Sequence, residues 1–72
     1  MSMVQPLTFR VDTTSTTGAT YIGTAAVGAS ETAPVWKLQK VVTIGVVIET
    51  LYANGEAGFN SAWTDRLAKT YS

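Results

Sequence analysis

The stretch from Pro34 to Tyr52 constrains the fold of this chain more than any other part of the sequence. It holds two runs rich in β-branched residues, separated by Ile44-Gly45. Such residues suit the pleated surface of a sheet, and a glycine between two runs of this kind is typical of a tight turn. The pattern predicts an antiparallel hairpin over residues 34–52, which the remaining chain must extend or cover.

The residues before this hairpin are predicted to add further strands. Apolar and polar residues alternate from Leu7 to Asp12, the period of a half-buried strand with Phe9 as its anchor. A second short strand is predicted over residues 20–25. The threonine-rich segment 12–20 between them is interpreted as a solvated connection in preference to a receptor-contacting loop. Residues 1–6 are expected to form an N-terminal arm.

The chain after the hairpin begins with a strong turn signal and then changes period. Asn54-Gly55 suits a turn because both residues tolerate positive φ. Asn60 has the character of an N-cap residue, and a short helix is expected near residues 60–66. Alternation returns afterwards and predicts a terminal strand over 67–71. The fold class expected is therefore mainly β, a small antiparallel sheet with one short helix, forming a single domain over residues 1–72.

The candidate core is assembled from the large apolar residues of these elements. Two tryptophans in so short a chain are interpreted as core residues rather than as a ligand platform, because each buries a large area. Arg66, one helical turn after Trp63, is expected to make a cation–π contact with that indole. The candidate core residues are Phe9, Tyr21, Ile22, Trp36, Leu38, Val42, Ile48, Phe59 and Trp63.

Length and composition indicate that contact with other subunits completes this fold. A chain of 72 residues is close to the size at which one core is only marginally sufficient, and it has no cysteine for disulfides. Charged residues make up 14%, against roughly 25% in typical globular domains. A threonine-rich surface is the alternative explanation, but the run Val41–Ile48 also has the signature of a strand that needs a covered edge. The candidate interface residues are Met3, Val4, Leu67, Lys69 and Tyr71.

Several functional classes are disfavoured by the residues present. The chain has no histidine or cysteine and no nucleophile, phosphate-loop or metal-ligand motif, so we expect neither an enzyme nor a cofactor, metal or small-molecule ligand. The formal net charge is zero with scattered cations, which argues against duplex nucleic acid as a partner. The longest apolar segment is too short to cross a bilayer, and the N-terminus lacks the pattern of a secretory signal, so no membrane partner is expected.

Three blocks of the sequence together resemble small virion-associated proteins of tailed bacteriophages. They are Tyr-x-Gly-x-Ala from Tyr21, Trp-Lys-x-x-Lys from Trp36, and Phe-x-x-x-Trp-x-x-Arg from Phe59, followed by a terminal strand. The resemblance covers about three quarters of the chain. It implies a structural role in a phage particle, as capsid decoration, head–tail junction or fibre or tail attachment, with copies of itself or other phage structural proteins as partners. It also implies a location in the virion, assembled in the bacterial host cytoplasm.

A binding module is the alternative from a different functional class. In that interpretation the chain is a receptor- or glycan-binding tip that presents the exposed aromatic side chains of Trp36, Tyr52 or Trp63. The two hypotheses differ in where the aromatic residues lie. Buried tryptophans with apolar surface turned outward favour assembly, whereas an exposed aromatic row beside Asn54, Glu56 or Asp65 favours glycan binding.

Overall fold

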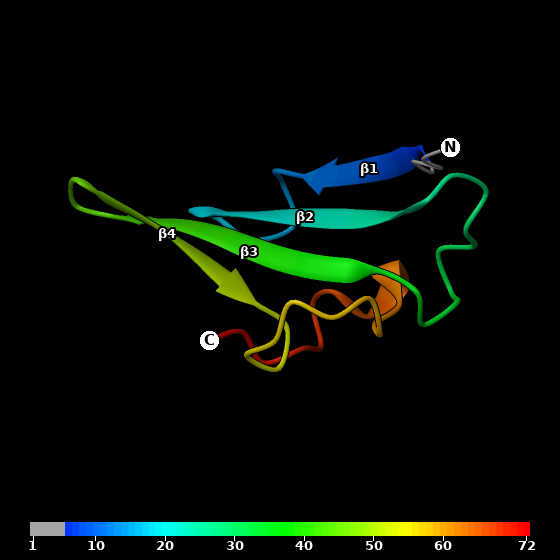
Figure 1. The fold of residues 1–72 in the computed structure, drawn as a ribbon. Helices are drawn as coiled ribbons and strands as arrows, with labels where there is room; N and C mark the ends of the chain where they lie inside the picture. Colours follow the sequence, from blue (N-terminus) through cyan, green and yellow to red (C-terminus); the bar gives the residue numbers. More distant parts are fainter. Residues whose placement is uncertain (1–5) are drawn as a thin grey trace.

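Four strands form one antiparallel sheet in a computed structural model of the chain, which describes residues 6–72 (Figure 1). Each strand pairs with the next one in the sequence, giving the order β1-β2-β3-β4. The mainly β fold class is confirmed, and so is the hairpin predicted over residues 34–52. The strands are β1 (Leu7–Asp12), β2 (Ala19–Ala26), β3 (Lys37–Ile44) and β4 (Val47–Tyr52).

The β3–β4 hairpin turns at Gly45-Val46 and extends beyond the rest of the molecule (Figure 1). Ile44 pairs with Val47 across a two-residue turn, and Gly45 has φ of +62°, a conformation that glycine adopts without steric cost. Val46 at the turn is fully exposed. Most of the apolar run found in the sequence, residues 43–48, therefore forms a projecting tip rather than the centre of the core.

The connection from β1 to β2 is a turn built on an aspartate side chain. Asp12 Oδ1 accepts hydrogen bonds from the backbone N–H groups of Thr14 and Ser15, both at 3.1 Å. Such a bond satisfies backbone donors that have left the sheet. Gly18, with φ of +79°, completes the reversal. Of the residues predicted as an N-terminal arm, positions 1–5 lie outside the described residues, and the carbonyl of Pro6 accepts a hydrogen bond from Val27 N–H at 3.3 Å.

The core forms on one face of the sheet around two tryptophans. Trp36 is completely buried and Trp63 is 6% exposed, with their ring centroids 6.1 Å apart. Gly23 of β2 lies directly beneath them, because a Cβ at this position would be 2.5 Å from Cε3 of Trp63 and 3.1 Å from Cε3 of Trp36. The missing side chain therefore lets both indoles lie against the sheet. The close approach at Gly23 is thus made by side chains and not by another backbone.

The chain after β4 folds back as a cover over this face of the sheet. Asn54 and Gly55 both have positive φ, 56° and 71°, which confirms the predicted turn. The cover, residues 53–72, is attached to the sheet at two places, by the bridge of Ser61 with Trp36 and by the hydrogen bonds of Ser72 with Tyr52. A further bridge, Ala53 with Tyr71, joins the two ends of the cover. Between these attachments it contains little regular structure of its own, so side-chain contacts hold it in place.

The structure differs in two details from the elements predicted after the hairpin. The helix expected near residues 60–66 is a three-residue 3-10 turn, Trp63–Asp65, capped by Ala62 without a side-chain hydrogen bond. Asn60 donates instead to the carboxylate of Glu56. The strand expected over 67–71 is reduced to the bridge at Tyr71, because residues 66–69 form a turn in which Ala68 N–H bonds to Asp65 O. Seating the indole of Trp63 over Gly23 fixes the path of this segment more strongly than its own periodicity does.

Candidate interaction surface

The strand register divides the side chains of the sheet between two faces. Phe9 pairs with Thr24, and Thr24 pairs with Lys37, so these side chains point to the same side. The open face consists of Leu7, Phe9, Val11, Thr20, Ile22, Thr24, Ala26, Lys37, Gln39, Val41, Thr43, Ile48, Thr50 and Tyr52. The covered face consists of Thr8, Arg10, Asp12, Ala19, Tyr21, Gly23, Ala25, Leu38, Lys40, Val42, Ile44, Val47, Glu49 and Leu51.

The open face presents large apolar side chains to solvent. Phe9 and Val11 of β1 are each 61% exposed, and Ile48 of β4 is 69% exposed. Leu7 extends the apolar surface along β1, and Ile22 of β2 lies partly buried beside Val11. The apolar side chains of β1 and Ile22 adjoin one another, and contiguous apolar surface on a small protein is typical of an interaction site.

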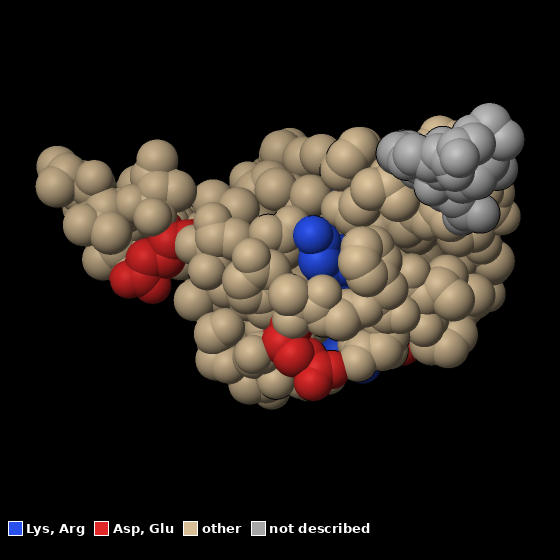
Figure 2. Space-filling model, in the orientation of Figure 1, with Lys and Arg blue, Asp and Glu red and all other residues tan. Residues whose placement is uncertain are grey.

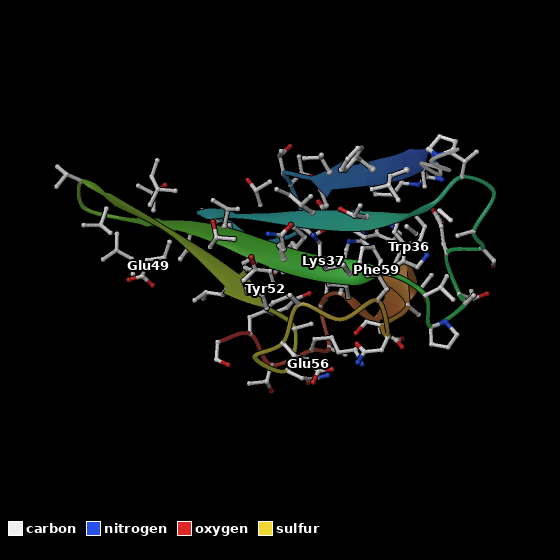
Figure 3. All side chains as sticks on the ribbon, in the orientation of Figure 1. Trp36, Lys37, Glu49, Tyr52, Glu56 and Phe59 are labelled. Carbon is white, nitrogen blue, oxygen red and sulfur yellow. The ribbon has the colours of Figure 1, made fainter. Side chains whose placement is uncertain are left out.

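The charged residues of the sheet are distributed in the opposite way. The four strands contain five of them, and four lie on the covered face: Arg10, Asp12, Lys40 and Glu49. The fifth, Lys37, is the one charged residue that the strands place on the open face. In Figure 2 most of this side is uncharged, with one main blue group at the position where Figure 3 labels Lys37 and two red groups where Figure 3 labels Glu49, on the projecting hairpin, and Glu56. Apart from Lys37, the strands therefore place no charged residue on the open face.

Lys37 is not isolated on the open face, because Phe59 lies against it. The ammonium nitrogen is 5.5 Å from the centroid of the Phe59 ring, and the two side chains are adjacent in Figure 3. This cation–π contact disperses the charge over an aromatic surface. Phe59 is 49% exposed, so the prediction that it belongs to the core is wrong. Phe59 lies outside the core because the cover places Trp63, rather than Phe59, over Gly23, where the sheet has no side chain.

Charged groups of the covered face contact aromatic rings or opposite charges. Arg10 Nε donates to Glu31 at 2.9 Å, and its guanidinium carbon lies 5.6 Å from the Trp36 ring centroid. Lys40 Nζ lies 5.8 Å from the Tyr21 ring and 5.9 Å from the Tyr71 ring. The aliphatic stem of a lysine can cover apolar surface while its ammonium group reaches the edge. Through its contact with Tyr71, Lys40 thus helps to hold the end of the cover on the sheet.

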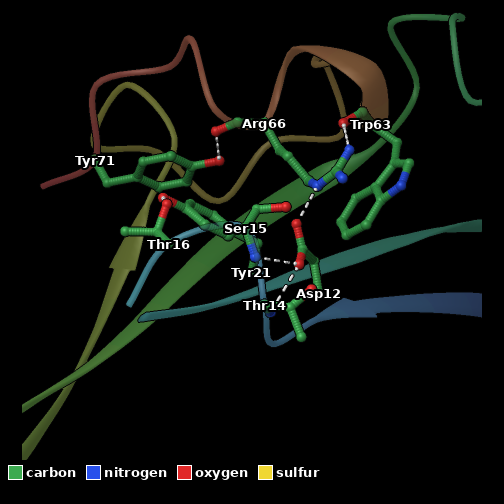
Figure 4. Close-up of polar contacts among 8 residues, drawn as sticks. All are labelled: Asp12, Thr14, Ser15, Thr16, Tyr21, Trp63, Arg66 and Tyr71. Carbon is green, nitrogen blue, oxygen red and sulfur yellow. Dashed lines mark hydrogen bonds and ion pairs between the residues drawn. The ribbon is translucent and has the colours of Figure 1, made fainter. Parts of the chain in front are cut away.

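An ion pair between Asp12 and Arg66 joins the β1–β2 turn to the cover (Figure 4). Arg66 Nε donates to Asp12 Oδ2 at 2.9 Å, and the guanidinium carbon lies 4.4 Å from the Trp63 ring centroid. The predicted contact between Arg66 and Trp63 is therefore confirmed. Hydrogen bonds from Ser15, from Arg66 and from the Thr14 amide hold the pKa of Asp12 far below its ordinary value. Its oxygens are occupied by internal donors, so this cluster is a structural clasp rather than a ligand site.

A pair of tyrosines anchors the end of the cover beside this clasp. The rings of Tyr21 and Tyr71 lie 5.7 Å apart, and Tyr71 Oη donates to the carbonyl of Arg66 at 2.8 Å. Burial, followed by the nearby Tyr21 hydroxyl, raises the pKa of Tyr71 to about 12. Tyr21 in turn shares a hydrogen bond with the hydroxyl of Thr16. Tyr71 was predicted as an interface residue, but the structure places it against its own chain.

The structure separates the predicted core residues into two groups. Those of the first group lie in or against the core: Tyr21, Trp36, Leu38 and Trp63 are buried, and Val42 is partly buried. Those of the second group lie outside it, and their prediction as core residues is wrong: Phe9, Ile48 and Phe59 are exposed, and Ile22 is on the open face. Phe9 and Ile48 lie at alternating positions of their strands, as expected, but their side chains point to the open face, which the cover does not reach. The indoles require the gap at Gly23, whose missing side chain belongs to the opposite face.

The candidate interface residues have different surroundings. Leu67 is 55% exposed and Lys69 is partly buried, whereas Met3 and Val4 lie outside the described residues. Apolar residues that the prediction missed are more exposed than Lys69: Leu7, Val11, Ile44, Val46 and Val47. For Leu7 and Val11 the sequence contained a signal. In strand β1 the uncharged alternating set belongs to the open face and the set carrying Arg10 and Asp12 to the covered face.

The aromatic residues of the alternative binding hypothesis do not form an exposed row. Trp36 and Trp63 are buried, and Trp36 Nε1 donates to the carbonyl of Ser30 at 2.9 Å. Tyr52 is partly buried on the open face, and Glu56 lies away from it in the cover (Figure 3). Within residues 6–72, three or more acidic residues do not come together as metal ligands, and helices long and apolar enough for a membrane span are also missing.

Comparison with known proteins gives no relative from which a role can be transferred. No known family, curated protein or solved structure matches this chain. The functional argument therefore depends on the sequence and on the arrangement of the two faces.

Proposed function

We propose that this chain is a non-enzymatic structural protein of a tailed-phage particle. It acts by packing its open face against copies of itself or against other proteins of the particle. The observation that carries the proposal is the distribution of residues over the sheet, with large apolar side chains on the exposed face and most of the strand charges on the covered face. Solvent would favour the reverse distribution, whereas a second protein layer favours this one.

The assignment to a phage particle is supported by the resemblance of three sequence blocks, whose residues have framework roles in this fold. Tyr21 and Trp36 are buried, and Gly23 accommodates the indoles. Trp63 and Arg66, which close the third block, form the stacked pair that fixes the cover. A pattern of this kind specifies a scaffold and leaves the surface free to match a partner, which suits a structural component.

The alternative, a receptor- or glycan-binding tip, has weaker support. It requires exposed aromatic rings on which a sugar can stack, and both tryptophans are buried in the core. Tyr52 and Phe59 remain accessible, but Phe59 is already in contact with Lys37. Packing against protein is therefore the function that the geometry supports best.

The test is incorporation into purified phage particles, measured by quantitative mass spectrometry of the chain relative to the major capsid protein. Phe9→Lys adds a charge to the open face at a residue that is 61% exposed, so it should leave the fold intact and strongly reduce incorporation. Thr17→Lys adds the same charge in the exposed β1–β2 turn and is the matched control. A chain absent from particles, or Phe9→Lys incorporated as well as Thr17→Lys, would contradict the proposal.

A further inference from the structure

Strand β4 is an outer edge of the sheet, and its backbone directions can be derived from its last residues. Tyr52 exchanges two hydrogen bonds with Ser72, N–H to O at 3.1 Å in each direction, so its polar groups point away from β3. Ala53 N–H points the other way, to Leu38 O at 3.1 Å. Because these directions alternate along a strand, the N–H and C=O groups of Thr50 and Ile48 also point outward.

The outward groups of Ile48 and Thr50 form no backbone hydrogen bond with any of residues 6–72. The position beside Tyr52 is filled by the end of the cover, since Tyr52 bonds to Ser72 and Asn54 N–H bonds to Thr70 O at 2.7 Å. An additional strand at this edge therefore has space from Leu51 toward the tip of the hairpin. Exposed edges of this kind are templates for pairing with another chain unless charge, proline or a bulge blocks them.

The side chains along this edge are apolar and exposed on both sides of the hairpin. Ile48 is 69% exposed on the open face, and Ile44 and Val47, on the other face, are 61% and 52% exposed. The segment contains no proline or lysine, and Glu49 is its one charged residue (Figure 3). The usual devices that prevent edge pairing are therefore almost missing from residues 43–50.

The geometry points to a second copy of this chain as the occupant of this edge, paired antiparallel through β4 about a two-fold axis at Ile48. An antiparallel strand is complementary to itself about such an axis, because each residue offers the donor and the acceptor that its symmetry mate requires. In this register Ile48 faces Ile48 of the second copy, and Thr50 faces Val46. The two sheets then join into one sheet of eight strands.

Charge and space select this register over the neighbouring one. Centring the axis on Glu49 would place two glutamates directly opposite each other, an arrangement that is destabilising. It would also bring the tip of the second copy to Tyr52, where Ser72 already occupies the edge. With the axis at Ile48, Glu49 faces Val47 and the tip ends at Thr50. The projection of the hairpin beyond the rest of the molecule lets the two copies approach without collision (Figure 1).

The expected interface is small, so the affinity should be modest. It is formed by one short strand and the four exposed apolar residues Ile44, Val46, Val47 and Ile48 from each copy. Interfaces of this extent are at the lower end of the range for specific complexes, roughly 1,200 Å² in total. Association should therefore be measured over a wide concentration range by sedimentation equilibrium on the purified 72-residue chain.

The decisive variant is Ile48→Pro, which removes the outward N–H without removing a hydrogen bond to β3. It should weaken the dimer by roughly tenfold or more, the loss expected from two backbone hydrogen bonds. Ile48→Val keeps the N–H and should dimerise nearly as well as the original chain. Phe9→Pro makes the equivalent change on β1, the opposite edge of the sheet, and should leave the dimer intact.

Near-ultraviolet circular dichroism of the buried tryptophans reports whether each variant is folded. If Ile48→Pro unfolds, a chemically synthesised chain with an N-methylated amide at residue 48 tests the same hydrogen bonds with the side chain retained. A chain that stays monomeric at every concentration, a dimer unaffected by loss of the Ile48 N–H, or a dimer broken by Phe9→Pro instead would overturn the inference. The test uses the isolated chain, so its outcome is independent of whether the protein belongs to a phage particle.

Discussion

Both faces of this four-stranded sheet carry large apolar side chains, but the chain itself covers only one of the two faces. The covered face buries Trp36 and Trp63 against Gly23, and it pairs Asp12 with Arg66 of the cover. Its two cations, Arg10 and Lys40, lie against aromatic rings. The open face has equally apolar strands but leaves Phe9 and Val11 in solvent. The cover buries the centre of one face, whereas the large apolar side chains of the other face have no second layer over them. Apolar alternation shows which residues share a face, but it does not show whether the chain itself supplies the cover.

The largest difference between the faces should be seen when one aromatic residue is removed from each. Trp36→Ala removes a fully buried indole and should cost about 3–5 kcal/mol of the free energy of unfolding, enough to unfold a small domain. Phe9→Ala on the open face should change it by about 0.5 kcal/mol or less. Urea denaturation followed by circular dichroism measures both. Equal losses would show that the two faces do not differ as described.

A smaller effect is expected from filling the gap beneath the indoles. Gly23→Ala places a methyl group 2.5 Å from Cε3 of Trp63, and this overpacking should cost about 1–3 kcal/mol. Gly58→Ala is a matched control, because its new methyl group meets the side-chain amide of the exposed Asn60, at 3.2 Å. Melting temperatures of the two variants give the comparison. A Gly23→Ala chain as stable as Gly58→Ala would contradict the proposed role of the glycine.

The clasp between Asp12 and Arg66 should make the attachment of the cover sensitive to acid. The pKa of Asp12 is depressed in the folded chain, so its contribution to stability is present above its unfolded pKa of about 3.9 and is lost as the pH falls below that value. Asp12→Asn should lower stability near neutral pH and flatten its dependence between roughly pH 5 and pH 2. Thermal melts of both chains across this range provide the test. Parallel pH profiles would show that the clasp contributes nothing.

The sequence predicted those parts of the fold that local patterns determine. The central hairpin follows from two β-branched runs around Gly45, and the turn after β4 follows from Asn54-Gly55. The first strand follows from alternation between Leu7 and Asp12. Each of these features depends on residues close together in the chain, so composition and period were sufficient to place them.

The sequence did not predict which face the cover would occupy. That choice depends on Gly23 meeting Trp63, forty residues later, and on Asp12 pairing with Arg66, 54 residues later. Large apolar residues suggested that Phe9 and Ile48 were core residues, because a folded chain usually buries them. The same long-range contacts reduce the expected helix to a 3-10 turn, since the position of Trp63 fixes the backbone on either side of it.

The central claim is that the open face is covered by protein in the native assembly, and side-chain footprinting tests it most directly. Hydroxyl-radical oxidation should be compared between the dilute isolated chain and the assembled protein in purified particles. We expect Phe9 and Leu7 to be reactive in the isolated chain and protected in the assembly, with Trp36 protected in both. Equal oxidation of Phe9 in the two states would contradict the account, because it would show that the apolar face remains in water.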